Sequence, residues 1–326
     1  DLTDRQNIQF HWVRIEDVPA IWEKLEANGL NTWDACGDVP RVILGSPVAG
    51  IAKDEIIDAT PAIRQIQEIV TAEEFQNLPR KFKSAISGNA RQDVVHEIND
   101  LAFIGVEHPE LGPGFECYVG GGLSTNPMLA QSLGAFVTLE QVPDVWANVV
   151  RIFRDYGYRR LRNRARLKFL VAEWGVEKFR QILEDDYLGY RLPDGPHAPN
   201  NLVDRDHIGV HEQKDGNVYI GVKPTLGHMS GEQLIALADL AEKYGVTDLR
   251  FTPFKEVLLL GVAPDTAANL QADLEEMGLY SKPSEFRRGL LSCTGLEYCK
   301  LAHVTTKSRA IELADELEER FGDLDS

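Results

Sequence analysis

Alternating apolar and polar side chains near the start of the chain predict a strand. In residues 5–13, apolar Ile8 and Phe10 alternate with polar neighbours, and a period of two is typical of a half-buried strand. The next segment, DVPAIWEKLEANGL, has the spacing of an amphipathic helix that ends at Gly29. The apolar run RVILGS at 41–46 then predicts a second strand.

The middle of the chain mixes helical segments with short strands. Between residue 51 and about residue 190, the runs AFIGVE and FECYVGGG predict strands. The polar, proline-containing stretch RLPDGPHAPNNLVDRD at 191–206 predicts a linker. Beyond it, NVYIGVK predicts a strand, SGEQLIALADLAEKYG a helix, and DLRFTPFKEVLLLGV a single strand.

Two segments resemble each other at a constant offset of 249 residues. The matched pairs are Thr3 with Thr252, Val13 with Val262, Leu25 with Leu274, Gly29 with Gly278 and Leu30 with Leu279. Chance similarity between two ordinary strand–helix–strand units is one explanation. We favour a duplicated half with pseudo-twofold symmetry and a cleft shared by the two copies. The first copy lacks the strand and helix that precede the second at 217–245, so we expect the chain to be a fragment.

Composition narrows the class of protein. The chain has 326 residues, of which 43% are hydrophobic, so we expect two or three domains with large cores. No apolar stretch approaches the roughly 20 residues of a membrane span, and no signal segment leads the chain. Four cysteines are too few for a disulfide scaffold, which indicates a reducing compartment and hence the cytoplasm. The net charge of −17 argues against nucleic-acid binding.

A basic segment interrupts this acidic composition. Residues 151–168, RIFRDYGYRRLRNRARLK, contain eight basic residues and one acidic residue. They could form an ordinary solvated helix face with structural ion pairs. They could also form a docking patch for an acidic partner protein.

Cys293 and Cys299 form a C-x5-C motif in SCTGLEYCKLA, which we place in a turn between an apolar strand and a helix. Paired thiolates suit an iron–sulfur cluster or zinc. Two inert buried cysteines would give the same spacing. Iron–sulfur clusters usually take four cysteines, and the residues after Cys299 supply no others.

Two further motifs could bind anions. In LPRKFKSAISG, Lys81 and Lys83 would lie on one side of a strand and Phe82 on the other. Their ammonium groups repel each other, so they need solvent or an anion between them; an exposed strand face is the simpler explanation. The glycine run at 120–122 could bring backbone N–H groups close to carboxylates or phosphates, or could form only a tight turn.

Together these motifs resemble the siroheme-containing sulfite and nitrite reductases from end to end. TDRQNIQFHWV is similar to the family's TTRQ siroheme-binding strand, ACGDVPRVILGSP to the strand that follows, LPRKFK and VGGGLSTNP to its central signatures, and CTGLEYC to the first half of its cluster motif. The chain departs from the family in having TDRQ for TTRQ. It also lacks an upstream strand with a further anion-binding arginine and the second cluster motif, C-x3-C.

The resemblance implies an α+β fold. We expect pseudo-twofold duplicated ferredoxin-like halves combined with α/β siroheme-binding domains, the second one truncated. The implied domains are residues 1–50 (remainder of the first ferredoxin-like half), 51–205 (central siroheme- and substrate-binding α/β domain), 206–290 (second half) and 291–326 (start of the iron–sulfur and siroheme domain).

The resemblance also assigns site residues. Arg41, Lys81 and Lys83 match the positions that hold the anionic substrate above siroheme. The positions near the macrocycle are Thr3, Arg5, Gln9, His11, Arg80, Gly120, Gly121 and Gly122. Cys293 and Cys299 match two of the four ligands of a [4Fe–4S] cluster. Cationic side chains suit a macrocycle with many carboxylates and a small oxyanion.

The implied activity is the six-electron reduction of sulfite to sulfide, with ferredoxin as electron donor. The nitrite reductase of the same family is the alternative, and a non-catalytic module without a complete cluster is an alternative of another class. ACGD around Cys36 resembles the sulfite branch, in some members of which this cysteine is cross-linked to a tyrosine; Cys36 could also be a plain core residue. We expect Cys117 to be an inert strand residue, and the protein to be a monomer that binds no nucleic acid or membrane.

Overall fold

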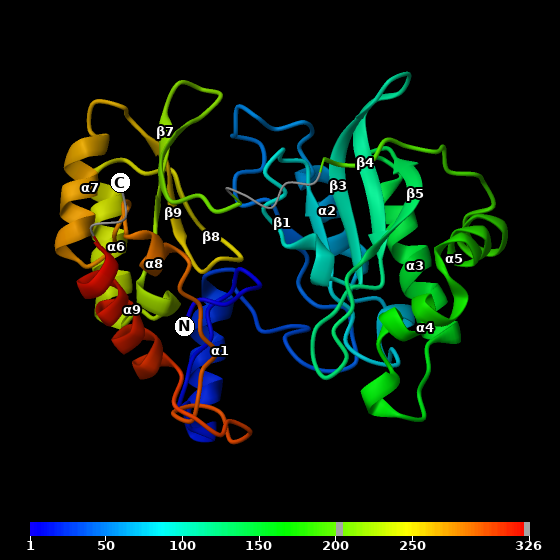
Figure 1. Cartoon of the computed structure of the whole chain (residues 1–326), viewed down its shortest axis with the longest axis horizontal. Coiled ribbons are helices and arrows are strands. Elements are labelled where there is room, and N and C mark those ends of the chain that lie inside the picture. Colours follow the sequence, from blue (N-terminus) through cyan, green and yellow to red (C-terminus); the bar gives the residue numbers. More distant parts are fainter. Residues whose placement is uncertain (200–204, 323–326) are drawn as a thin grey trace. The chain divides into compact units, whose positions relative to one another are not determined.

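The computed structural model describes residues 1–199 and 205–322 and divides the chain into two compact units. Unit 1 consists of Asp1–Gly29 and Asp206–Ser326, and unit 2 is Leu30–Arg205. Figure 1 shows both units, which are described separately below. The predicted domain boundaries at residues 50, 205 and 290 stay predictions. The predicted linker at 191–206 lies partly outside the described residues.

Unit 2 is built around a five-stranded sheet in the order β1-β2-β3-β4-β5. Pairs β1–β2 and β2–β3 are parallel, and pairs β3–β4 and β4–β5 are antiparallel. Its strands are β1 (Leu44–Gly45), β2 (Ser84–Ser87), β3 (Leu101–His108), β4 (Gly112–Val119) and β5 (Gln131–Val137); its helices are α2 (Thr60–Ile69), α3 (Val142–Tyr156), α4 (Leu167–Trp174) and α5 (Val176–Ile182), followed by a π-helix at Leu183–Leu188. The two strands predicted from AFIGVE and FECYVGGG are confirmed as β3 and β4. Only two residues of the predicted strand at 41–46 form β1.

The core of unit 2 lies between the sheet and its helices. Fully buried aromatic residues of β3, β4 and α3 meet there, among them Phe103, Phe115, Trp146 and Phe153. The Trp146 Nε1–H donates to Ser84 Oγ at 2.9 Å, so the indole stays hydrogen-bonded while buried. This packing fixes the start of β2, immediately after Lys83.

Unit 1 contains a four-stranded sheet in the order β6-β7-β9-β8, with all neighbours antiparallel. Its elements are α1 (Val18–Ala27), β6 (Gly209–Glu212), β7 (Val218–Val222), α6 (Gly231–Lys243), β8 (Asp248–Phe251), β9 (Val257–Val262), α7 (Ala267–Glu276), α8 (Glu285–Arg288) and α9 (Lys307–Phe321). Helices α6 and α7 lie on one face of the sheet (Figure 1), where Leu237, Leu270 and Leu274 join the strand residues in one core. A capping box between Ser230 and Gln233 starts α6.

The single strand predicted at 248–262 is wrong, because the segment folds back on itself as the hairpin β8–β9. Thr252 Oγ1 accepts the N–H groups of Phe254 and Glu256, and Lys255 has a φ of 64°. A left-handed residue cannot continue an extended strand. The threonine side chain thus closes a turn where the apolar pattern by itself indicated continuity.

The strand predicted at 5–13 is wrong for the same reason. A bridge between Leu2 and Ile8 closes a turn over residues 3–7, and both Gln6 and Trp12 have a φ of 57°. Thr3 Oγ1 accepts the N–H groups of Arg5 and Asn7 at 3.3 and 3.1 Å. The polar residues of this segment therefore project from a turn and an irregular stretch.

The two turns show that the repeat is structural. Thr3 and Thr252 accept hydrogen bonds from residues at the same relative positions, and the Leu2–Ile8 bridge corresponds to the Phe251–Val257 pair of β8 and β9. Helix α1 (Val18–Ala27) coincides with α7 (Ala267–Glu276) at the same offset of 249 residues. The predicted α+β fold with duplicated ferredoxin-like halves is confirmed.

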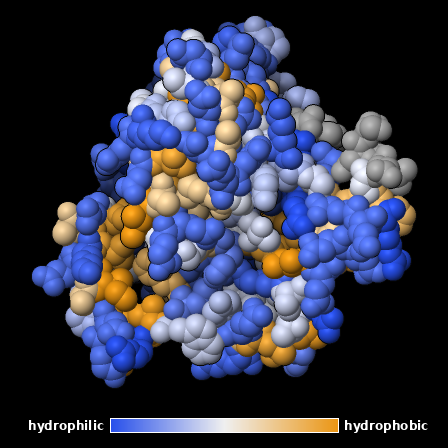
Figure 2. All heavy atoms as spheres, turned by 90° about the vertical axis from the view of Figure 1, so that its left-hand side faces the viewer, coloured by the Kyte–Doolittle hydropathy of each residue, from blue (hydrophilic) through white to orange (hydrophobic). Residues whose placement is uncertain are grey.

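The apolar strand expected before Cys293 does not form. Residues 289–306 contain neither helix nor strand, and leucines in this stretch, such as Leu291 and Leu301, are exposed. Figure 2 shows a surface that is hydrophilic over most of its area, with hydrophobic residues in separate patches. In the described part of the chain, no helix combines the length and the apolar character needed to cross a membrane.

Candidate anion and cofactor site

In unit 2, Arg41 lies beside the segment of the two lysines. Pro40 and Phe82 form a parallel bridge, and the Arg41 N–H donates to Phe82 O at 2.8 Å. Phe82 is fully buried, whereas Lys81 and Lys83 on either side of it are only partly buried. The expected alternation around Phe82 is confirmed, although the lysines lie just before β2 and not inside a strand.

Lys81 is surrounded by other cations. Its pKa is lowered, first by burial and then by the positive charges of Arg166, Arg41 and Arg80, with only Asp100 acting in the opposite sense. Three guanidinium groups close enough to affect one ammonium group create a strongly positive field. An anion placed there would relieve this repulsion.

Arg41 also shapes the loop around Cys36. Its NH1 and NH2 groups donate to Ala35 O at 2.8 Å and to Gly37 O at 2.9 Å, and the Cys36 thiol between them is exposed. Arg41 Nε is buried and has no hydrogen-bond partner among the described residues. A buried donor without a partner is costly, so this N–H is available to an anion. Cys36 is therefore a loop residue and not part of the core.

Asp100 forms hydrogen bonds with several segments of this site. Its fully buried carboxylate accepts the Lys83 N–H at 2.8 Å and two N–H groups of Arg166 at 3.0 and 2.6 Å. Its carbonyl accepts the N–H of Gly120 at 2.8 Å. Asp100 therefore connects the lysine segment, the glycine run and Arg166. The sequence analysis missed Asp100 and noted Arg166 only as part of the basic segment.

The glycine run is closely packed. Gly120, Gly121 and Gly122 donate their N–H groups to the carbonyls of Asp100, Asn99 and Met128, respectively. These N–H groups are therefore occupied by backbone carbonyls, which disfavours the first of the two alternatives for the run, binding of an anion by its N–H groups. A side chain at Gly121 would lie 2.4 Å from Glu97 O, which explains why glycine is needed there. A role of the run in lining the macrocycle stays a prediction.

Lys168 fixes the loop that follows the glycines. Its ammonium group is 3.1 Å from Gly122 O and 2.8 Å from Leu123 O, and it also donates to Asn126 O. The residue is 3% exposed, so this cation is part of the scaffold. The sequence analysis noted Lys168 only as part of the basic segment.

Most of the other basic residues at 151–168 have structural partners. Arg151 pairs with Glu74, Arg154 with Asp155, and Arg162 with Asp38. Arg80 shares Asp38 with Arg162 at a longer distance of 3.4 Å. These contacts agree with the simpler explanation of the basic segment. A docking role stays a prediction.

In unit 1, the predicted macrocycle residues come from the first turn and the stretch after it. Thr3 Oγ1 closes the turn that carries Arg5, and the Gln9 N–H donates to Asp1 O at 2.7 Å. His11 Nε2 lies 2.8 Å from Asp1 Oδ2, and the imidazole is largely buried. Burial is the main cause of its lowered pKa.

Cys293 and Cys299 lie on one irregular loop. Cys293 Sγ is 3.7 Å from Thr306 Oγ1, and hydrogen bonds with Thr306 and the Gly295 N–H lower the pKa of its thiol. A side chain at Gly295 would lie 2.6 Å from Thr306 Oγ1, so the loop requires glycine there. By contrast, Cys117 is buried in β4, and burial raises its pKa; this agrees with the expectation that it is inert.

The residues present provide some of the groups that a [4Fe–4S] cluster and an anionic ligand need. A thiol with a lowered pKa on an exposed loop is a suitable cluster ligand. Two thiols are half of a [4Fe–4S] ligand set, and the described residues contain no group of three or more His, Cys, Asp or Glu able to hold a metal ion. The unpartnered Arg41 Nε and the cations around Lys81 fit an anionic ligand.

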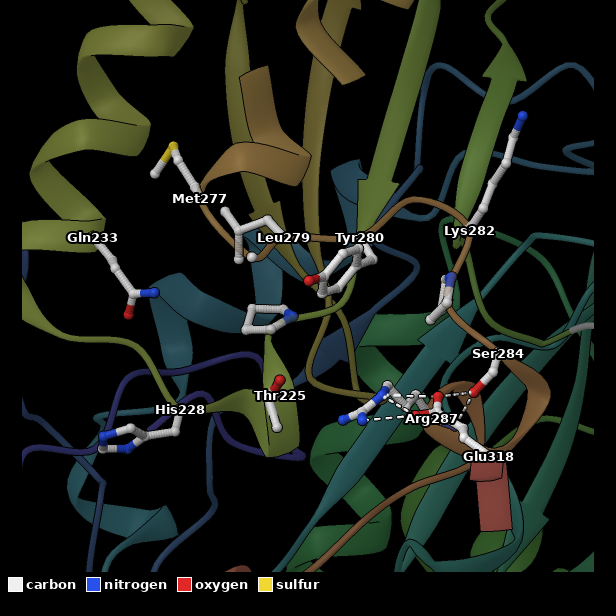
Figure 3. A pocket seen from close by; sticks show the side chains of 13 residues that line it. Thr225, His228, Gln233, Met277, Leu279, Tyr280, Lys282, Ser284, Arg287 and Glu318 are labelled. Atoms are coloured by element: carbon white, nitrogen blue, oxygen red, sulfur yellow. Dashed lines mark hydrogen bonds and ion pairs between the residues drawn. The ribbon is translucent and has the colours of Figure 1, made fainter. Parts of the chain in front are cut away.

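A separate cavity of about 540 Å³ lies in unit 1 (Figure 3). Arg287 and Ser284 both bind Glu318 at one edge, while Lys282 points away from the other labelled side chains. His228 forms another part of its wall. The lining residues include none of the predicted site residues, so this cavity is distinct from the site described above.

Two family models match the chain. Residues 36–192 match "Nitrite and sulphite reductase 4Fe-4S domain", and residues 1–28 and 211–277 match "Nitrite/Sulfite reductase ferredoxin-like half domain". The chain belongs to the nitrite and sulfite reductase family. This family consists of oxidoreductases with siroheme and a [4Fe–4S] cluster as cofactors. The resemblance drawn from the sequence motifs is confirmed.

Curated relatives support the same conclusion. The chain is 54% identical over 326 residues to "Sulfite reductase [ferredoxin] 2" of Mycolicibacterium paratuberculosis, which covers 99% of this chain and 58% of the relative. It is 36% identical over 330 residues to "Assimilatory ferredoxin-dependent nitrite reductase" of Haloferax mediterranei, with 96% and 56% covered. The chain thus spans less than two thirds of the length of these relatives.

The fold is likewise similar to a solved structure. "Structure of Mycobacterium tuberculosis NirA protein" superposes with a TM-score of 0.96 at 51% identity, covering 100% of this chain and 59% of that one. The backbone of this chain therefore closely follows that of the solved protein.

Proposed function

We propose that this chain contributes the anion-binding centre of a ferredoxin-dependent sulfite reductase, which reduces sulfite to sulfide with six electrons. The observation that carries the proposal is the convergence of Arg41, Arg80 and Arg166 on Lys81. Arg166 and Arg80 are paired with Asp100 and Asp38, and the excess positive charge that remains at Lys81 and Arg41 suits a small, doubly charged oxyanion. When bound, siroheme and a [4Fe–4S] cluster would pass electrons from ferredoxin to the substrate.

Each cation has a distinct part in this proposal. Arg41 offers its buried, unpartnered Nε–H to the anion while its other nitrogens hold the Cys36 loop. Lys81 and Lys83 bind oxygen atoms of the substrate. Because neighbouring cations and burial lower the pKa of Lys81, its ammonium group gives up a proton more readily than an ordinary lysine. It can therefore deliver protons as oxygen atoms leave as water.

The cofactor-holding roles rest on the resemblance of the sequence motifs to the family. Arg5, His11 and Arg80 would provide positive or hydrogen-bonding groups for siroheme carboxylates, together with Thr3 and Gln9. The glycine run at 120–122 would line the macrocycle without donating its N–H groups, which are bonded to backbone carbonyls. Cys293 and Cys299 provide two thiolates for the cluster, which needs two more.

We propose sulfite rather than nitrite as the substrate, because the relatives named as sulfite reductases are more similar in sequence to this chain than those named as nitrite reductases. Sulfite reductases are 54% and 52% identical to this chain, whereas nitrite reductases are 36% and 37% identical. We further propose ferredoxin as donor, a cytoplasmic location and a monomeric state. A non-catalytic module remains the alternative of another class.

The test uses the purified holoprotein with reduced ferredoxin. We expect siroheme, about four irons per cluster, and a higher kcat/KM for sulfite than for nitrite. A higher kcat/KM for nitrite would assign the protein to the nitrite branch. A purified protein that takes up neither cofactor would be the non-catalytic module.

A further inference from the structure

The Asp1 carboxylate connects three segments of unit 1 that are far apart in the sequence. Its Oδ2 lies 2.8 Å from His11 Nε2, and its Oδ1 lies 2.9 Å from His228 Nδ1 and 2.7 Å from Lys307 Nζ. The side chain of Asp1 is 4% exposed, so this carboxylate is inside the unit. His228 precedes α6, and Lys307 is the first residue of α9.

His11 is held from a second direction by the cysteine loop. Its imidazole stacks on the ring of Tyr298, with centroids 3.9 Å apart and planes 20° from parallel. Tyr298 is the residue before Cys299. Asp1 therefore fixes the edge of the imidazole while Tyr298 covers its face, which leaves the ring little freedom to rotate.

Lys307, which follows the C-terminal end of the cysteine loop, pairs with the same Asp1 carboxylate. The preceding residue, Thr306, donates to Cys293 O at 2.7 Å and lies 3.7 Å from Cys293 Sγ. The Lys307 side chain is only 10% exposed, so its charge depends on Asp1. A buried ion pair is strongly destabilised when one partner is removed, because the other charge is left unpaired.

We propose that Asp1 is a positioning residue that holds His11 and the loop of Cys293 and Cys299 in one fixed arrangement. This proposal rests on the proposed function, in which His11 faces the macrocycle and the two cysteines bind the cluster. The carboxylate reaches the loop twice, through Lys307 and through the His11–Tyr298 stack. Asp1 touches neither substrate nor cofactor in this scheme; it acts through the groups that do.

The first test is Asp1→Asn in the holoprotein, with Asp4→Asn as control because Asp4 is exposed on the same turn. Asparagine keeps the shape of aspartate but cannot neutralise Lys307. We expect kcat for sulfite to fall about 10-fold to 100-fold, the range seen when groups that orient metal ligands are changed. KM should stay within about twofold, because Arg41, Lys81 and Lys83 are unchanged. The control should match wild type in both constants.

The second readout does not depend on turnover. Amide hydrogen exchange should become faster in residues 9–12 and 293–306 of Asp1→Asn and stay unchanged in Asp4→Asn. Unchanged exchange in residues 293–306, an unchanged kcat, or a raised KM with normal kcat would each overturn the proposal. If wild type reduces no sulfite, the proposed function fails, while the exchange measurement still tests the connection through Asp1.

A second variant covers the case in which Asp1→Asn does not fold. Lys307→Gln removes one contact with the loop and leaves Asp1 bonded to His11. We expect faster exchange in residues 293–306, with little change in residues 9–12. Normal exchange in residues 293–306 of this variant would contradict the proposal.

Discussion

Gln6 and Lys255 occupy the same position in two copies of one turn, 249 residues apart, and both have a left-handed backbone with φ of 57° and 64°. In each copy a threonine three residues earlier accepts two backbone N–H groups. The two copies carry different side chains. The first turn presents Arg5, and in the second Lys255 Nζ donates to Ser292 O, next to Cys293.

We expect Thr252, in the buried turn, to contribute more to the free energy of unfolding than the exposed Thr71. Thr252 is fully buried, accepts the N–H groups of Phe254 and Glu256, and donates to Glu256 Oε2 at 2.7 Å. Thr252→Val leaves these groups without a partner, so we expect the free energy of unfolding to fall by about 1–3 kcal/mol. Urea unfolding measures this change. The exposed Thr71→Val serves as control and should change stability little.

The loop after the glycine run is expected to depend on Lys168. Lys168→Met leaves the carbonyls of Gly122, Leu123 and Asn126 without their cation, and we expect a loss of about 1–3 kcal/mol in the free energy of unfolding. Thermal unfolding monitors this loss. Lys178 is exposed and contacts the ring of Trp174, so Lys178→Met is a matched control with a smaller expected effect. Equal stability of the two variants would show that Lys168 is not structural.

Glu116 is expected to make stability depend on pH. Burial by itself would raise the pKa of this carboxyl in β4, but hydrogen bonds from Ser132, Tyr118, the Ala198 N–H and His197 lower the pKa overall. A carboxyl with a lowered folded-state pKa stabilises the protein above its unfolded-state pKa of about 4.3, and this contribution is lost as the pH falls through the folded value.

The measurement is the free energy of unfolding of Glu116→Gln and wild type from neutral pH to about pH 3, well below the unfolded-state pKa of about 4.3. We expect the variant to be less stable at neutral pH, with a difference that shrinks as the pH falls, because protonation removes the charge from wild type. Glu107→Gln, exposed on β3, is the control. A constant difference over this range would mean that the charge of Glu116 contributes nothing.

The sequence predicted long periodic elements well and turns poorly. Helix α6 and strands β3 and β4 lie where the pattern placed them, because each buries a regular face in its own core. Helix α1 also lies at its predicted place, although none of its residues is buried. The pattern failed at Thr3 and Thr252, where a side-chain oxygen binds backbone N–H groups within a few residues. Apolar alternation continues through such a turn, so periodicity cannot detect it.

In the candidate site as well, the sequence indicated some residues and missed others. Arg41, Lys81 and Lys83 were assigned through motifs, and the backbone places them on neighbouring segments, while their role stays a prediction. Asp100 and Asp1 could not be found, because a buried carboxylate that pairs with distant cations leaves no local pattern. The partners of the glycine run could not be predicted either, since its N–H groups bind carbonyls of residues outside the run.

The most direct test of the account is the kinetics of Lys81→Ala in the holoprotein, with Lys178→Ala as control. The central claim is that Lys81 and the cations around it bind a small oxyanion, to which Lys81 delivers protons. We predict a fall in kcat/KM for sulfite of about 100-fold or more, with an unchanged siroheme absorption spectrum and normal activity of the control. Normal turnover in Lys81→Ala, or loss of siroheme from it, would contradict the claim.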